Sequence, residues 1–536
     1  MEFPDITFQF LAKVLTGSLS LFSTWSPDPE EPHAACLALK SSLKLENTTV
    51  TDASYLPAGS TVSTPGPCGY WETTEVHTAV CRVQFFTNTT DTSSVRAEAW
   101  LPDEWYGRFL ATGNGGLGGC IDYGSLDYGT SLHFATVGSN NGHDGNDGIV
   151  FLNQPEVIND FAFRAIHVEA VIGKQITETY YGRPHDKAYY SGCSTGGRQG
   201  TQAALKFPTD FDGILAGAPA TDFNHLLHWA GMLGRHIGAP NPSSSPSFIP
   251  LAMWKVIAAE IMKQCDGVDG VLDGIISEPD LCVFRPERLL CTSRRPLDSC
   301  LTPPQVAALH NIYSPLYGRH GDLVYPRFDP GTESDPLAPD LFSGQLSVLL
   351  QHWLKYAVLN DTEFDFSNYG FDELELMDAI NPGGIATWNG NFSAFRDRGG
   401  KFLTYHGRAD PLIPSGNSKR MYDLLAYTLR SPAASLDAFY RLFLVPGMGH
   451  CLGGPGATRF GQVYRQSNAV NASSHNILLA LVDWVEGGVA PDTMIGTAEQ
   501  GGATRAHCRY PQESVWNGEV FVCMPSLRLS ESNPAV

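Results

Sequence analysis

The chain has 536 residues, of which 43% are hydrophobic and 17% are charged, a composition typical of a globular protein with a large apolar core. Its formal net charge of -21 argues against binding to nucleic acid or to anionic membrane surfaces, and no apolar stretch is long enough to span a bilayer. The length allows one large domain and a substantial second one.

The first informative element is a short strand followed by a glycine-rich run. Phe109–Thr112 is predicted as a buried strand, and residues 113–119 read Gly-Asn-Gly-Gly-Leu-Gly-Gly. Glycines let the backbone approach a bound substrate closely, so this run is a candidate source of backbone N–H donors. A phosphate-binding loop is excluded, because the run lacks the Gly-Lys-Ser/Thr ending.

A second strand leads into a candidate nucleophile motif. Lys187–Ser191 is predicted as a strand and Arg198–Lys206 as a helix, and residues 192–196 between them read Gly-Cys-Ser-Thr-Gly. This order fits the G-x-S-x-G turn, in which a serine on a strained strand-to-helix turn projects above a sheet and small residues on either side avoid a collision. The motif makes Ser194 a candidate nucleophile, and the helix N-terminus would favour negative charge beside it. The alternative is a glycine-rich loop with a surface serine.

The middle of the chain departs from the alternation of strands and helices. Gly213–Ala218 is predicted as the next buried strand, but residues 222–395 contain many prolines, several aromatic residues and close cysteine pairs. A helix is predicted at Leu251–Met262, with an apolar face made of Leu251, Trp254, Ala258 and Ile261. We expect this segment to form a lid over the carboxyl edge of a mostly parallel sheet that helices cover on both faces.

An acidic, glycine-rich loop follows this predicted helix. Residues 265–275 read Cys-Asp-Gly-Val-Asp-Gly-Val-Leu-Asp-Gly-Ile, which partly matches an EF-hand loop that begins at Asp269. The match is incomplete, because position 3 is Val271, which offers only its carbonyl, and position 12 is Asp280 in place of glutamate. Two interpretations stay open: a calcium loop of carboxylates and carbonyls, or an acidic surface turn.

Two later strands each lead to a residue that could activate a serine. Phe402–Tyr405 runs into a loop that ends in Asp410, and Leu442–Val445 runs into a glycine-rich turn that carries His450. Singly, Asp410 before a proline could be a turn former, and His450 is one of 16 histidines. Because the chain order serine, acid, histidine is that of α/β-hydrolases, the set predicts a catalytic triad in which His450 is the general base and Asp410 orients it.

Two cysteines flank the predicted nucleophile and base. Cys193 directly precedes Ser194, and Cys451 directly follows His450. A disulfide between them would join the serine turn to the histidine loop and help to bring hydroxyl and imidazole to about 2.6–3.2 Å from each other. The alternative, that Cys193 is itself the nucleophile, is disfavoured because a side chain one position away from the serine of this turn points elsewhere.

Cysteine and sequon content indicates the compartment. The chain has 12 cysteines, several of them close together in polar segments, with no C-x-x-C pair, so disulfides are favoured over metal binding and an oxidising compartment is expected. N-glycosylation sequons begin at Asn47, Asn88, Asn360, Asn391 and Asn471. We therefore expect a secreted, extracellular glycoprotein, although the start of the chain is a poor signal peptide.

From Cys36 to Cys523 the chain resembles the tannase and feruloyl esterase family of α/β-hydrolases. The resemblance rests on the pairs Cys193-Ser194 and His450-Cys451 with Asp410 between them, and on the glycine-rich run at 113–119. It implies an α/β fold, with an α/β-hydrolase catalytic domain at 36–221 and 396–536, a lid domain with a calcium loop inserted at 222–395, and an N-terminal extension at 1–35.

Further site residues are expected on the same basis. Thr195, next after the nucleophile, should supply one N–H donor of the oxyanion hole, and the resemblance implies Gly115 or Gly116 as the other. It also implies a structural calcium ion in the lid, and no cofactor for catalysis, with the metal ligands Asp266, Asp269, Val271, Asp273 and Ile275. The other expected disulfides are Cys36–Cys81, Cys68–Cys120, Cys265–Cys282, Cys291–Cys300 and Cys508–Cys523.

The function that the resemblance implies is that of a secreted serine carboxylesterase that hydrolyses hydroxycinnamoyl (feruloyl-type) esters of plant cell-wall material through an acyl-enzyme. One alternative is a tannase acting on galloyl esters, or another aromatic-ester hydrolase. A different class is a catalytically silent binding protein on a hydrolase scaffold, which the intact serine, acid and histidine disfavour. We expect a monomer or homodimer with neither nucleic acid nor membrane as a partner.

Overall fold

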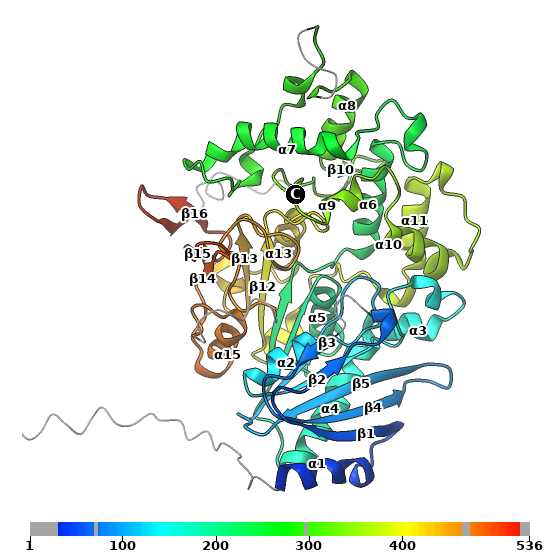
Figure 1. Ribbon diagram of the computed structural model, residues 1–536, viewed down its shortest axis with the longest axis vertical. Coiled ribbons are helices and arrows are strands. Elements are labelled where there is room, and N and C mark those ends of the chain that lie inside the picture. Colours follow the sequence, from blue (N-terminus) through cyan, green and yellow to red (C-terminus); the bar gives the residue numbers. More distant parts are fainter. Residues whose placement is uncertain (1–30, 69–72, 294–298, 464–471, 526–536) are drawn as a thin grey trace, which may run out of the picture.

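The computed structural model describes residues 31–68, 73–293, 299–463 and 472–525. Its centre is a nine-stranded sheet with the strand order β1-β4-β5-β7-β6-β8-β9-β12-β13 (Figure 1). The strands are β1 (Thr48–Leu56), β4 (Val80–Asn88), β5 (Ser94–Pro102), β6 (Arg108–Thr112), β7 (Phe134–Ser139), β8 (Lys187–Cys193), β9 (Gly213–Gly217), β12 (Lys401–Gly407) and β13 (Tyr440–Val445).

The sheet is mixed, with a parallel part that carries the predicted site. The strands from β7 to β13 in the sheet order pair in parallel, whereas β1, β4, β5 and β7 pair with antiparallel neighbours. The mostly parallel sheet of an α/β fold is therefore confirmed. The antiparallel strands at its N-terminal end were not predicted. They form a meander with alternating burial, which needs no crossover helix.

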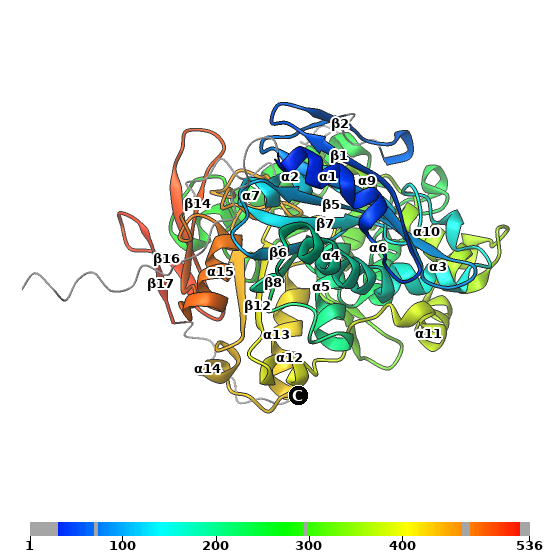
Figure 2. The ribbon, with the colours of Figure 1, turned by 90° about the horizontal axis from the view of Figure 1, so that it is seen from below.

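Helices cover both faces of the sheet (Figure 2). One face packs against α1 (Glu31–Ser42), α4 (Ala165–Tyr181), α5 (Thr195–Lys206) and α13 (Gly416–Thr428). The other face packs against α2 (Tyr123–Ser131) and α15 (Ile477–Gly487). This arrangement explains why the central strands are apolar on both sides, as the burial of every residue of β7 and β9 illustrates.

The segment between β9 and β12 forms a large insertion (Figure 1), and its apolar core also includes Leu117, Phe151 and Phe161 from the segment before β8. Its elements are α6 (Phe223–His236), α7 (Leu251–Cys265), α8 (Pro303–Ile312), β10 (Leu316–Tyr317), β11 (Leu323–Tyr325), α9 (Ala338–Leu341), α10 (Val348–His352), α11 (Phe371–Ile380) and α12 (Ser393–Asp397). The insertion falls where the lid is predicted, and the exact division into 36–221, 222–395 and 396–536 stays a prediction. Residues 1–30 of the expected N-terminal extension lie outside the described residues.

The remaining elements are short. They are β2 (Thr61–Ser63), β3 (Thr73–Glu75), α3 (Pro155–Asn159), α14 (Ala433–Leu436), β14 (Thr493–Thr497), β15 (Thr504–Cys508), β16 (Glu513–Trp516) and β17 (Phe521–Met524). None of the helices in the described ranges combines the length and hydrophobicity that a membrane crossing requires.

One predicted helix buries most of the expected face, but not its first residue. In α7, Leu251 is 49% exposed, while Trp254 and Ile261 are buried as expected together with Met253 and Ile257. Leu251 is the first residue of the helix and extends beyond the edge of the apolar core, so the buried stripe begins two residues later.

All 12 cysteines form disulfides, and every predicted pair is present. Cys36–Cys81 ties α1 to β4, Cys68–Cys120 joins the segment after β2 to the end of the glycine-rich run, and Cys265–Cys282 closes the acidic loop. The set of six bridges is typical of a protein that folds in an oxidising compartment.

Candidate active site

Ser194 occupies the sharp turn between β8 and α5. Its backbone angles, φ 64° and ψ -121°, lie in a region that non-glycine residues rarely adopt. The turn is fixed by hydrogen bonds, because Ser194 N donates to the Gly217 carbonyl at 2.9 Å and Ala220 N donates to the Ser194 carbonyl at 3.2 Å. This strained strand-to-helix turn is the geometry that the G-x-S-x-G motif predicts.

The two glycines of the motif leave room for this turn. A Cβ on Gly192 would lie 2.9 Å from the Gly196 Cα and 2.7 Å from the Tyr190 hydroxyl. A Cβ on Gly196 would lie 3.1 Å from the Asn114 carbonyl oxygen, so the glycine-rich run after β6 also packs against the serine turn. Larger residues at either position would push these segments apart.

The glycine-rich run is held against α5 by polar contacts. The Thr195 hydroxyl donates to the Gly116 carbonyl at 2.6 Å, and Gly113 N donates to the Ser191 carbonyl at 3.0 Å. The buried Gln199 side chain accepts from Asn114 N at 2.9 Å. The first residue of the helix and the run that follows β6 therefore lie side by side.

The predicted oxyanion donors are free to bind a substrate oxygen. Within the described ranges, the backbone N–H groups of Thr195, Gly115 and Gly116 donate to no protein acceptor. The Thr195 N–H is unpaired because the first N–H groups of a helix have no acceptor within that helix. The geometry keeps both Gly115 and Gly116 as candidates for the second donor, next to Thr195.

A disulfide joins the serine turn to the histidine loop. Cys193 and Cys451 are bonded with their Cα atoms 6.0 Å apart, although they are separated by 258 positions in the chain. Since consecutive Cα atoms are about 3.8 Å apart, the Cα atoms of Ser194 and His450 lie within about 14 Å of each other. In the described structure the Ser194 hydroxyl and the His450 ring make no hydrogen bond, and in a substrate-free site this contact is often long and tightens when substrate binds.

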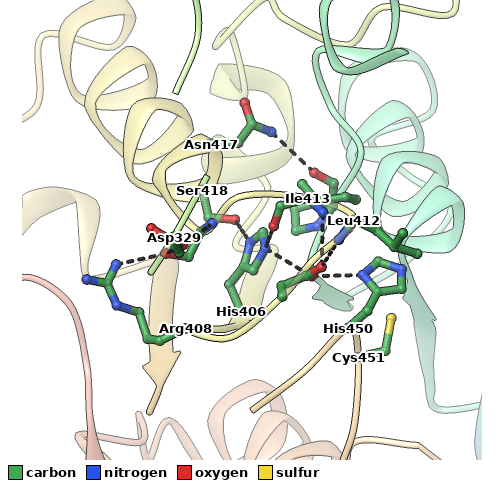
Figure 3. Close-up of polar contacts among 12 residues, drawn as sticks. Asp329, His406, Arg408, Leu412, Ile413, Asn417, Ser418, His450 and Cys451 are labelled. Carbon is green, nitrogen blue, oxygen red and sulfur yellow. Dashed lines mark hydrogen bonds and ion pairs between the residues drawn. The ribbon is translucent and has the colours of Figure 1, made fainter. Parts of the chain in front are cut away.

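The predicted acid and base are in direct contact (Figure 3). His450 Nδ1 lies 2.8 Å from Asp410 Oδ2, so Nδ1 carries the proton and Nε2 is left to accept one. The other carboxylate oxygen of Asp410 accepts from Leu412 N at 2.8 Å and from Ile413 N at 2.9 Å. The Asp410 carboxylate is thus fixed by its own loop and orients the ring, as the triad prediction requires.

Electrostatics at this pair favour a charged acid and a basic imidazole. Burial alone would raise the pKa of Asp410, but the rings of His450 and His406 hold this pKa below its usual range. Burial alone would lower the pKa of His450, but the Asp410 carboxylate and, more weakly, that of Asp335 raise it above the ordinary histidine value. These opposite shifts suit an ionised acid beside a general base.

A second histidine supports the acid and was not predicted. His406 Nε2 lies 2.8 Å from the Ile413 carbonyl and 3.3 Å from Asp410 Oδ2, and its Nδ1 lies 2.7 Å from the Ser418 hydroxyl. The ring is fully buried. Its position four residues before Asp410, on the strand that leads to the acid, was the available signal.

The acid loop is also tied to the insertion through a buried cation. Arg408 donates to Asp280 Oδ2 at 2.8 Å and to the Ser415 hydroxyl at 2.8 Å, and Ser415 donates to Asp329 Oδ2 at 2.6 Å. Arg408 is 1% exposed, so it depends on these partners to balance its charge. The insertion therefore packs against the loop that carries Asp410.

The predicted calcium ligands lie in one acidic loop of the insertion. Asp266, Asp269 and Asp273 each accept a backbone N–H of their own loop, and no group of three or more His, Cys, Asp or Glu side chains among the described residues is arranged to hold a metal ion. One carboxylate oxygen of Asp269 is nevertheless buried without a hydrogen-bond partner. Burial and the neighbouring Asp269 and Asp266 carboxylates raise the pKa of Asp273. A cation bound there would give the Asp269 oxygen a partner and would offset the negative charge that the three carboxylates place together.

This acidic loop touches the histidine loop. A Cβ on Gly447 would lie 3.1 Å from the Ile275 side chain, and Gly447 is three residues before His450.

Four of the predicted glycosylation sites, Asn47, Asn88, Asn360 and Asn391, are exposed, and Asn471 lies outside the described residues.

Comparisons with known proteins agree on one family. The model of the family described as "Tannase and feruloyl esterase" matches residues 79–526. A relative from Aspergillus clavatus, named "Probable feruloyl esterase B", is 42% identical over 493 residues, covering 90% of this chain and 93% of its own.

Solved structures show the same similarity. The crystal structure of feruloyl esterase B from Aspergillus oryzae superposes with a TM-score of 0.89 at 39% identity, covering 92% of this chain and 100% of the other. The tannin acyl hydrolase from Aspergillus niger has a TM-score of 0.73 at 23% identity, covering 94% and 96% of the two chains, and shares the fold.

Proposed function

Because the chain belongs to the tannase and feruloyl esterase family and is a carboxylic ester hydrolase, we propose that it is a secreted serine esterase that hydrolyses hydroxycinnamoyl (feruloyl-type) esters of plant cell-wall material. The observation that carries the proposal is the disulfide between Cys193 and Cys451, which brings the strained Ser194 turn and the His450–Asp410 pair to one edge of the sheet. Relatives named feruloyl esterase B support the hydroxycinnamoyl acyl group.

The first half-reaction forms an acyl-enzyme. His450 Nε2 removes the proton of the Ser194 hydroxyl as its oxygen attacks the ester carbonyl, and the imidazolium is stabilised by Asp410, 2.8 Å from Nδ1. Backbone N–H groups of Thr195 and of Gly115 or Gly116 bind the oxyanion. His450 then gives the proton to the departing alcohol.

The second half-reaction releases the acid. A water molecule takes the position of the alcohol, and His450 accepts one of its protons as the oxygen attacks the acyl carbonyl. The tetrahedral intermediate uses the same N–H donors, and its collapse restores the Ser194 hydroxyl and frees the aromatic carboxylic acid.

We also propose a structural calcium ion in the insertion, held by the carboxylates of Asp266, Asp269 and Asp273 and the carbonyls of Val271 and Ile275. The unpartnered oxygen of Asp269 supports this. The ion would supply positive charge to a crowded acidic loop and would take no part in the reaction. Exposed sequon asparagines and six disulfides fit passage through a secretory pathway.

The experiment that tests the proposed acyl preference is a matched panel of methyl esters of ferulate, caffeate, p-coumarate and gallate. We expect the highest kcat/KM on one of the three hydroxycinnamates. A preference of about tenfold or more for methyl gallate would instead indicate a tannase.

A further inference from the structure

A second acidic side chain approaches the histidine loop from the insertion. Asp335 lies between β11 and α9, and its backbone is fixed by hydrogen bonds from Asp335 N to the Thr332 carbonyl at 3.0 Å and from Ala338 N to the Asp335 carbonyl at 3.1 Å. Its Oδ1 accepts from Leu337 N at 2.9 Å. With one carboxylate oxygen held in this way, the direction of the other oxygen is determined.

The other oxygen, Oδ2, points at the residue before the base. A Cβ on Gly449 would lie 2.3 Å from Asp335 Oδ2, so a side chain there would displace the carboxylate from its present position. Gly449 therefore gives the carboxylate direct access to the backbone of the histidine loop, next to His450. Glycine at position 449 leaves room for the carboxylate of Asp335, which lies more than a hundred positions earlier in the chain.

Asp335 and His450 each shift the pKa of the other. Burial raises the pKa of Asp335, the Asp410 carboxylate raises it further, and His450 lowers it. In return, the charge of Asp335 adds to that of Asp410 in raising the pKa of His450. Asp335 is partly exposed, so water screens this effect to some extent.

Among the titratable groups around His450 and Asp410, Asp335 makes its own contribution to the charge that faces His450. His450 is faced by Asp410 from the loop after β12 and by Asp335 from the insertion. Asp410 is also faced by His406, Tyr405 and Tyr325, and the Tyr405 hydroxyl donates to the Cys451 carbonyl at 3.4 Å. Burial raises the pKa of both tyrosine hydroxyls well above neutrality, so these two groups stay uncharged.

We propose that Asp335 is a positioning residue for the general base: its carboxylate, presented by the insertion and seated on Gly449, stabilises the protonated form of His450 and holds the turn that carries it. The insertion would thus contribute a charge to the catalytic machinery. The proposal deepens the proposed function and rests on it. Asp335 exchanges no proton with the substrate and acts through His450.

The test is the pH dependence of kcat/KM for Asp335→Asn, measured on methyl ferulate in the full-length protein. Asparagine keeps an oxygen to accept from Leu337 N and removes the charge. We expect the midpoint of the acid limb to move to lower pH by about 0.5–1 unit, because loss of a nearby negative charge makes imidazolium less stable. At the plateau, kcat should fall about three- to tenfold with KM nearly unchanged, since a weaker base transfers the proton less well.

Asp340→Asn is the matched control, because Asp340 is an exposed acid of the same segment. It should leave both the acid limb and kcat unchanged. If Asp335→Asn is too unstable to purify, Asp335→Ser also removes the charge and keeps a small oxygen acceptor for Leu337 N. A purely structural role would lower Tm and the amount of active enzyme without moving the acid limb.

An acid limb identical to that of the wild type in both charge-removing variants, with hydrolysis still dependent on Ser194, would overturn the proposal for Asp335. Retention of hydrolysis by Ser194→Ala would instead overturn the proposed function. The two failures are distinguishable because the first concerns the pH profile and the second concerns the nucleophile.

Discussion

His450 Nδ1 and Asp410 Oδ2 lie 2.8 Å apart, and the other partners of the Asp410 carboxylate, Leu412, Ile413 and His406, belong to its own strand and loop. The acid is therefore in place before substrate binds, and only the serine hydroxyl has to complete the proton path. This relationship defines how the site should respond to mutation and to pH.

Asp410→Asn should lower kcat by about 10³- to 10⁴-fold, since an amide cannot stabilise the imidazolium and can favour the wrong tautomer of His450. The amide oxygen can still accept from Leu412 N and Ile413 N, so the fold should be kept. Single-turnover rates and circular dichroism check both points. A loss of less than about tenfold would argue against Asp410 as the acid of the triad.

Activity should decline on the acid side with a midpoint above the ordinary histidine pKa of 6.5, because the carboxylates raise the pKa of His450 and only its neutral form can act as a base. The sign is unambiguous: lowering the pH protonates His450 and removes the base. A profile of kcat/KM against pH on methyl ferulate measures the midpoint. A midpoint well below 6.5 would contradict the electrostatics described for this site.

Removal of the disulfide in Cys193→Ser/Cys451→Ser should reduce kcat by about 100-fold, because the serine turn and the histidine loop lose their covalent connection and misplacement of reacting groups is costly. The long loop that it closes also implies a stability loss of up to about 5 kcal/mol. The double variant Cys291→Ser/Cys300→Ser, which opens a bridge across 9 positions in the insertion, is the control and should retain kcat. Equal kcat values for the two double variants would show that the catalytic bridge is only structural.

Gln199→Met should lower kcat about 10- to 100-fold with a smaller effect on KM, because Gln199 fixes Asn114 at the start of the loop that carries the second oxyanion donor. Methionine preserves the volume of the buried side chain and removes its hydrogen bonds. Gln202→Met, three residues later on the same helix and bonded to the Gly384 carbonyl, should reduce stability without lowering kcat. A comparable kcat loss in both variants would contradict a specific role for Gln199.

Chelation of calcium by EGTA should lower Tm by several degrees, and Asp273→Asn should reduce or remove that sensitivity, since a bound ion stabilises the folded state by its binding free energy. Because Ile275 packs against Gly447, some loss of kcat should accompany the loss of stability. Asp322→Asn, at an exposed acid elsewhere in the insertion, is the control. An unchanged Tm in EGTA, together with no calcium by elemental analysis, would exclude the ion.

The sequence predicts where Ser194, Asp410 and His450 lie in the fold, because each is at the end of a strand in a short local pattern. Ser194 is defined by two glycines and a following helix, and the order of Asp410 and His450 behind it is that of an α/β-hydrolase. Cys193 and Cys451 add a contact between distant positions that local patterns could not provide. The full set of disulfides was expected from the family resemblance, because 12 cysteines allow very many pairings and their spacing alone does not choose among them.

The supporting residues could not be predicted, because their roles depend on contacts between segments far apart in the chain. Asp335 acquires its role from Gly449, and Gln199 acquires its role from Asn114, and neither residue belongs to a recognisable motif. The prediction that Leu251, at the start of α7, is buried was wrong for a similar reason. The edge of the apolar core is set by neighbouring elements and not by helical periodicity.

The most direct measurement is the hydrolysis of methyl ferulate by Ser194→Ala, together with labelling of the wild-type protein by a fluorophosphonate and identification of the modified peptide. The account predicts that the variant folds with a Tm close to that of the wild type, hydrolyses no ester above background, and is not labelled, while the wild type is labelled on Ser194 alone. Substantial hydrolysis by Ser194→Ala, or a label on another residue, would contradict it.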